Sequence, residues 1–226
     1  MSVPIPIELE AKLLVTRAGD LRVIARLTAI GKYRLRPRPS TRLHSIYLDT
    51  PERTLARHKV ALRVRRDTGR WEATAKWAGH AEGDIHARPE LTVSLRRAPR
   101  MPFELPAGPL RTRLAPLVAQ RPLLPLLITE ISRRRRDVFA MPRRDRLPLA
   151  ELALDRVRLR APGQRRAVAT YSEIEIERRR GHRRTIAQLA QLLRSRFALT
   201  PSTESKFARG LRLLYGPQRR IKRRSS

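Results

Sequence analysis

The chain has 226 residues, enough for one large domain or two small ones, and its 51 Lys and Arg against 20 Asp and Glu give a formal net charge of +31. That balance favours a polyanionic partner, namely nucleic acid, an acidic membrane surface or a phosphate chain, although a GC-rich genome that writes Arg wherever Lys would serve also produces a basic surface. The absence of Cys excludes disulfides, thiolate metal sites and cysteine nucleophiles, and an aromatic content of 4% offers no evident platform for stacking bases.

The sequence shows no targeting or membrane segment. The first ten residues lack a basic segment followed by an apolar run, so we expect no signal peptide. The most apolar stretch, residues 122–128, is too short to cross a bilayer. We therefore expect a cytoplasmic protein with no membrane partner.

The first predicted strand, IELEAK at residues 7–12, has a charged face and an apolar face. Glu8, Glu10 and Lys12 occupy alternate positions, and successive side chains of a strand point to opposite sides. Two acids beside one base can hold a divalent cation and a phosphate together. The alternative is a half-solvated edge strand, and recurrence of the pattern on other strands argues against it.

Alternation of this kind recurs along the chain. It predicts strands at residues 7–12, 43–49, 60–66, 71–77, 86–95, 126–140, 149–159 and 171–177. Turns or loops are expected at residues 34–42, 68–69, 79–84 and 99–109. The first of these is basic and broken by Pro37 and Pro39, and Pro89 indicates an edge or a bulge in its own strand.

Helical spacing and capping residues predict helices at residues 18–30, 55–58, 110–120, 183–197 and 203–215. Gly31 would end the first of them. Thr50 and Pro51 have the N-cap and N1 residue types for the second, and Ser202 or Thr203 would cap the last.

Eight strands with several hairpin-length turns favour an α+β fold: a closed or nearly closed eight-stranded antiparallel β-barrel, a tunnel, with helices packed outside. We expect residues 1–215 to form this one domain and residues 216–226 to form a basic disordered tail.

The charged strand faces could point outward or into the lumen. An inward orientation leaves apolar faces for the amphipathic helices to cover, so we favour it. Such a lumen would offer Arg and Lys to phosphate oxygens, and its crowded glutamates would need Mg²⁺ or Mn²⁺ to stay ionised. Phosphoryl transfer to water suits this combination.

The IELEAK run resembles the Glu-x-Glu-x-Lys signature of the CYTH superfamily, the triphosphate tunnel metalloenzymes. Further similar segments follow in the family's order, from residue 7 to about residue 214: YLDTPERTLARHKVALRVRRDTGRWEATAKW, HARPEL, LAELALD, SEIEIE and ESKFARG. The resemblance implies an eight-stranded tunnel that binds triphosphate end-on with a divalent metal.

The resemblance also implies residue roles. The metal ligands would be Glu8, Glu10, Glu175 and Glu177, and the phosphate-binding residues would be Lys12, Arg63, Arg65, Lys76, Arg88, Arg133, Arg135 and, near the tunnel mouth, Lys206. Lys12 and Glu90 would act in catalysis, Glu90 as a supporting or water-orienting acid. Thr92 departs from the pattern, because many relatives have an acid or amide there. The five His residues lack ligand spacing and are interpreted as ordinary polar residues.

The expected function is metal-dependent hydrolysis of inorganic triphosphate or a related triphosphorylated compound. Class IV adenylate cyclase and thiamine triphosphatase are the alternatives within the family, and a non-catalytic polyphosphate-binding module is the alternative outside catalysis. A general nucleic-acid binder is a third hypothesis, with contact expected only through the basic tail. The oligomeric state stays open.

Overall fold

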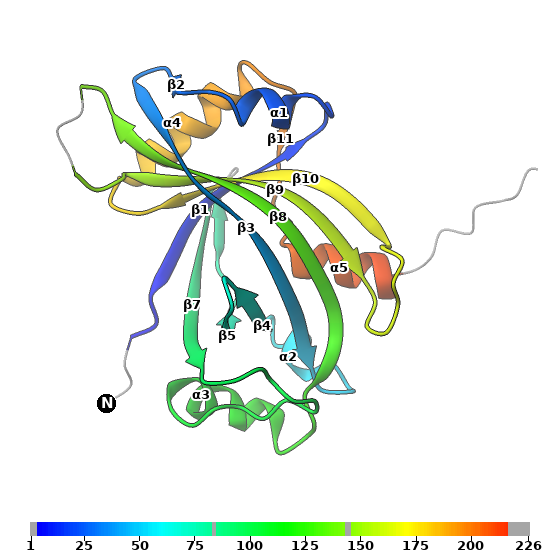
Figure 1. Ribbon diagram of the computed structural model, residues 1–226. Helices are drawn as coiled ribbons and strands as arrows, with labels where there is room; N and C mark the ends of the chain where they lie inside the picture. The colour runs from blue at the N-terminus through cyan, green and yellow to red at the C-terminus, as the bar shows by residue number, and fades with distance from the viewer. Residues whose placement is uncertain (1–3, 83–84, 143–145, 217–226) are drawn as a thin grey trace, which may run out of the picture.

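A ring of eight antiparallel strands organises the molecule (Figure 1). The computed structural model describes residues 4–82, 85–142 and 146–216. The ring strands are β1 (Ile7–Val15), β3 (Tyr33–Asp49), β4 (Ala61–Asp67), β5 (Arg70–Lys76), β7 (Ile85–Leu95), β8 (Leu124–Ala140), β9 (Ala150–Arg160) and β10 (Ala169–Arg178). Their order is β1-β10-β9-β8-β3-β4-β5-β7, and pairing of β7 with β1 closes the ring. The predicted eight-stranded antiparallel tunnel is confirmed.

Helices and three short strands surround the ring. They are α1 (Asp20–Ile24), α2 (Thr54–Arg57), α3 (Pro109–Val118), α4 (Arg183–Arg194), α5 (Lys206–Tyr215), β2 (Ala29–Ile30), β6 (His80–Glu82) and β11 (Leu199–Pro201). One apolar core joins α1 and α4 to the outer faces of β1, β9 and β10, and a second joins α2 and α3 to β4 and β5. These cores use the apolar half of each alternating strand.

Helix α5 occupies a different place from the other helices. Phe207 stacks on Tyr47, with ring centroids 5.2 Å apart, and packs in a core with Leu43 and Ile131. Ile131 lies on the face of β8 that carries Arg133 and Arg135, and both Leu43 and Ile131 line the interior cavity. Helix α5 therefore covers an apolar end of the tunnel interior, whereas the sequence predicted all helices outside.

The segment expected as a loop at residues 34–42 is instead the first half of β3. Pro37 is tolerated because β4 pairs with β3 only from His44 onward, which leaves this half of the strand with an edge. A shift of register between Arg38 and Thr41 accommodates Pro39. The helix expected at residues 18–30 is also wrong in its second half, where Ala29 and Ile30 pair with β3.

Other boundaries differ at capping residues. The Thr50 hydroxyl accepts a hydrogen bond from the backbone N–H of Thr54, and Asp49 accepts from those of Leu55 and Ala56, so α2 begins at Thr54, one residue before the expected start. Ser205 caps α5 by accepting from Ala208 N at 3.1 Å, so that helix begins three residues later than expected.

Two further expectations concern ends and turns. The turn expected at residues 79–84 contains β6, which pairs with β7, while its last two residues lie outside the described residues. The expected tail from residue 217 onward also lies outside them. Among the described residues, no helix is long and apolar enough to cross a membrane.

Candidate active site

One cavity of about 1010 Å³ inside the ring collects every residue that the sequence singled out for binding or catalysis. The predicted residues that line it are Glu8, Glu10, Lys12, Arg63, Arg65, Lys76, Arg88, Glu90, Arg133, Arg135, Glu175, Glu177 and Lys206. On β1 the alternate residues Ala11 and Leu13 are fully buried in the outer core. The charged faces therefore point inward.

Lys76 on β5 joins two of the predicted acids. Its Nζ lies 2.5 Å from Glu8 Oε2 and 2.8 Å from Glu90 Oε2. Burial alone would lower the pKa of Lys76, but the carboxylates of Glu10, Glu8 and Glu90 raise it above its ordinary value. The ammonium group is therefore charged at neutral pH, and it holds Glu8 and Glu90 at the cavity wall.

Four carboxylates gather where β1, β10 and β9 run side by side. Glu10 is opposite Glu177, and Glu177 is opposite Glu151, with Glu8 two residues before Glu10. Burial, followed by the negative charges of Glu8, Glu151 and Glu10, raises the pKa of Glu177 to about 7 although Arg179 opposes the shift. The ion pairs of this cluster therefore leave Glu177 easier to protonate than an ordinary glutamate.

A second network surrounds Lys206, the first residue of α5. Its Nζ contacts Glu173, lies 2.7 Å from Glu175 Oε1 and lies 3.2 Å from Asp155 Oδ2. Burial opposes ionisation of Glu175, but Lys206 and then Arg133 hold its pKa well below the ordinary value. Oxygens of Asp155, Glu173 and Glu175 all lie within 4.8 Å of one another, close enough to share a cation, and the Lys206 ammonium occupies that role.

The cavity also contains arginine donors without hydrogen-bond partners among the described residues. The Nε atoms of Arg63 on β4 and Arg135 on β8 are buried and, among the described residues, have no hydrogen-bond partner. Arg65 on β4 forms an ion pair with Glu72 at 3.3 Å. Because buried donors without partners are costly, these guanidinium groups are suited to an anion that enters the cavity.

His86 was not expected at the site. It is fully buried on β7, its Nε2 lies 2.8 Å from the carbonyl oxygen of Ser202, and its Nδ1 lies 3.3 Å from Arg88 Nη2. If Nε2 carries the proton and donates it to the carbonyl, Nδ1 accepts from Arg88. Sequence spacing could not reveal this, since the carbonyl group that holds the His86 ring belongs to Ser202, which is distant in the sequence.

Arg179 was also missed. Its guanidinium lies 2.8 Å from Glu177 Oε1 and 3.1 Å from Glu151 Oε2, and it lines the cavity. Extending the Glu173–Glu175–Glu177 alternation by one step would have found it. Thr92, the noted departure, donates a hydrogen bond of 3.2 Å to Glu90 Oε1, so a hydroxyl supports this acid.

The donor set has the chemistry for a divalent cation, while among the described residues only Asp155, Glu173 and Glu175 bring their oxygens within 4.8 Å of one another. Hard cations take carboxylate oxygens, and Glu8, Glu10 and Glu177 supply them around a part of the cavity that is crowded with negative charge. Glu175 lies next to this group but is already bound by Lys206 and Arg133.

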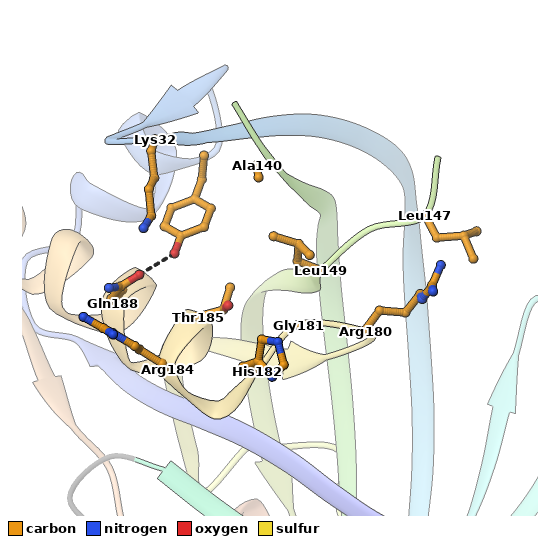
Figure 2. A pocket seen from close by; sticks show the side chains of 11 residues that line it. Lys32, Ala140, Leu147, Leu149, Arg180, Gly181, His182, Arg184, Thr185 and Gln188 are labelled. Atoms are coloured by element: carbon orange, nitrogen blue, oxygen red, sulfur yellow. Dashed lines mark hydrogen bonds between the residues drawn. The ribbon is translucent and has the colours of Figure 1, made fainter. Parts of the chain in front are cut away.

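A separate cavity of about 630 Å³ lies at the start of α4 and contains none of these residues (Figure 2). There Tyr33 donates a 2.7 Å hydrogen bond to Gln188 Oε1, which ties β3 to α4. The tunnel is therefore where the predicted chemistry gathers.

A closed antiparallel ring with acids and bases facing one interior cavity defines this protein as a charged β-tunnel. The CYTH domain model matches residues 6–211. The chain therefore belongs to the CYTH family.

Solved structures show the same fold at low sequence identity. A candidate adenylyl cyclase from Hippeastrum with a dominant triphosphatase activity is 18% identical with a TM-score of 0.61, over 90% of this chain and 94% of that one. A candidate adenylate cyclase from Bacillus halodurans is 21% identical with a TM-score of 0.61, over 92% and 98% of the two chains. The PH1819 protein from Pyrococcus horikoshii is 16% identical with a TM-score of 0.51, over 89% and 94%.

Proposed function

We propose that this protein hydrolyses inorganic triphosphate, or a closely related triphosphorylated compound, with Mg²⁺ or Mn²⁺. The observation that carries the proposal is that one cavity holds both buried arginine Nε atoms without hydrogen-bond partners among the described residues and a glutamate, Glu177, whose pKa burial and neighbouring acids raise. A phosphate chain and a divalent cation together would satisfy both groups. The tunnel domain would comprise residues 1–215.

The cationic residues would bind and orient the substrate. Arg63 and Arg135 would contact phosphate oxygens first, because among the described residues their Nε atoms have no hydrogen-bond partner, and Arg65 would join them from its ion pair with Glu72. Further positive charge around the bound phosphate chain would come from Lys12, Lys76, Arg88, Arg133 and Lys206. Arg133 and Lys206 would do so while they remain bound to Asp155 and Glu175.

Glu8, Glu10, Glu175 and Glu177 would hold the metal ion, which when bound neutralises charge on the phosphate oxygens. Glu90, held between Lys76 and Thr92, would orient the attacking water. Water adds to the terminal phosphorus as the bond to the bridging oxygen breaks, which yields orthophosphate and pyrophosphate and releases a proton to solvent. Lys12 would stabilise the charge that develops on the phosphate oxygens.

A substrate panel tests this proposal. Purified protein with Mg²⁺ or Mn²⁺ is incubated with tripolyphosphate, ATP and thiamine triphosphate, and the products are quantified. We expect the fastest release of orthophosphate from tripolyphosphate. Preferential formation of cyclic AMP from ATP would favour a cyclase instead, and tight binding of tripolyphosphate without turnover would favour a binding module.

A further inference from the structure

The outer face of the β3-β8-β9 sheet carries a cluster of arginines that the tunnel does not use. Five exposed residues form what we call the Ser132 patch: Arg42 on β3, Ser132 and Arg134 on β8, and Arg156 and Arg158 on β9. Leu43, Ile131 and Arg133 line the interior cavity, and Arg133 binds Asp155. Because side chains alternate along a strand, the patch residues next to them point away from the lumen.

The strand register brings the patch together. Ser132 is paired with Arg42 on one side and with Arg156 on the other. Cross-strand neighbours lie roughly 5 Å apart at Cβ, and Arg134 is about 7 Å further along the same face. Three guanidinium groups thus surround one exposed hydroxyl and can converge on an anion above it.

The residue types change abruptly along the outer face. Leu152 and Leu154 of β9 are buried in the core with α4, whereas the next outward residues, Arg156 and Arg158, are exposed. The patch therefore lies on the part of this sheet face that the core with α4 does not cover.

The cluster holds more positive charge than its neighbours neutralise. Glu130 lies 3.4 Å from Arg158 and 3.0 Å from Arg160, so its single charge is shared by two arginines. Like charges directly opposite each other on neighbouring strands destabilise a sheet, whereas side chains of both charge signs on a solvated face do not repel one another in this way. A bound polyanion would relieve this repulsion.

We propose that the Ser132 patch binds the phosphate backbone of nucleic acid. Arginine is suited to phosphate oxygens, and the Ser132 hydroxyl can donate to the same group. The patch contains no aromatic side chain for base stacking and no large apolar side chain for insertion into lipid. Contact would thus be made with phosphates, independent of base sequence, and with nucleic acid in preference to a membrane.

Fluorescence anisotropy with a labelled 20-nucleotide RNA and a 20-base-pair DNA, across 50 to 200 mM KCl, tests the proposal. The full-length triple variant Arg42→Ser, Arg134→Ser, Arg156→Ser should bind at least ten-fold more weakly at the lowest salt. The slope of log affinity against log salt should fall by about 2 to 3, since each phosphate contact contributes roughly 0.7 to 0.9. Replacing the same three residues by Lys should keep most of the affinity.

The matched control is Arg22→Ser, Arg97→Ser, Arg100→Ser, which removes the same charge from exposed positions on α1 and beyond β7. It should change affinity less than two-fold. An equal loss in both triple variants would overturn the proposal, because net charge alone would explain binding. Should the patch variant fail to fold, Arg156→Ser alone should lower the slope by about 1, and an unchanged slope would count against the patch.

Two further arms separate this surface from the tunnel and from lipid. Tripolyphosphate at concentrations that saturate the tunnel should leave RNA bound, and the patch variant should keep wild-type tripolyphosphate affinity. Displacement of RNA at those concentrations would overturn the proposal by assigning RNA to the tunnel. Phosphatidylserine vesicles should bind more weakly than RNA, and stronger, patch-dependent vesicle binding would assign the surface to a membrane instead.

Discussion

Arg133 binds Asp155 through two parallel hydrogen bonds, Nε to Oδ1 at 2.8 Å and Nη2 to Oδ2 at 2.7 Å. Asp155 is fully buried, and Lys206 shares its second oxygen at 3.2 Å. The pair joins β8 to β9 and sets the position of a guanidinium that faces the cavity. This ion pair is therefore expected to stabilise the fold as well as to position Arg133 in the cavity.

Asp155→Asn should lower the free energy of unfolding by about 3 kcal/mol, because removing one partner of a buried ion pair leaves the other charges uncompensated. Urea denaturation measures the loss. Glu204→Gln is the control: it breaks the exposed pair with Arg212 and should cost about 0.5 kcal/mol. An Asp155→Asn protein as stable as the wild type would show that this pair does not hold the two strands.

The raised pKa of Glu177 predicts how the stability of the metal-free protein depends on pH. Its pKa is about 7 in the folded protein against an ordinary 4.5, so the folded state holds a proton that the unfolded chain has already released. The resulting stabilisation is complete below pH 4.5 and is lost as the pH rises through 7. With EDTA present, the wild type should lose on the order of 2 kcal/mol more than Glu177→Gln between pH 5 and 8.

Urea titrations at each pH measure that difference between the two proteins. Identical pH profiles would show that Glu177 is not short of positive charge in the absence of metal. Addition of Mg²⁺ at pH 8 should raise the free energy of unfolding of the wild type more than that of Glu177→Gln, since the neutral amide is a poorer ligand than a carboxylate.

His86→Phe should weaken substrate binding, because Arg88 loses the acceptor that holds its guanidinium. A hydrogen bond to a charged group contributes roughly 1.5 kcal/mol or more, so we expect KM for tripolyphosphate to rise about ten-fold, with a smaller effect on kcat. Steady-state kinetics at pH 8 measure both. An equal KM in variant and wild type would exclude His86 from positioning Arg88.

Alternation was the informative signal in the sequence. Glu8, Glu10 and Lys12 on β1 and Arg63 and Arg65 on β4 are chemically marked at every second residue, so their shared face could be predicted. Their inward orientation followed from the need of amphipathic helices for an apolar surface. The CYTH motifs then supplied the roles of single residues, which alternation alone leaves open.

What the sequence concealed depends on tertiary context. Pro37 and Pro39 favour a loop locally, yet pairing with β8 extends β3 through them. His86 gains its role from Ser202, a partner that is distant in the sequence. Alternation could have indicated Arg179 as a site residue, but not its hydrogen bond to Glu151. Lys206 was expected near the tunnel mouth as a phosphate ligand, but its network of three carboxylates becomes visible only in three dimensions.

The most direct measurement is orthophosphate release from tripolyphosphate with Mg²⁺ or Mn²⁺ by the wild type, Glu10→Gln and Lys12→Ala. These substitutions remove one partner each from the ion pair at 2.9 Å beside the carboxylate cluster. We predict turnover by the wild type and a loss of at least about 100-fold in either variant, with circular dichroism unchanged. Equal turnover in all three proteins, or none in the wild type with either metal, would contradict a catalytic tunnel.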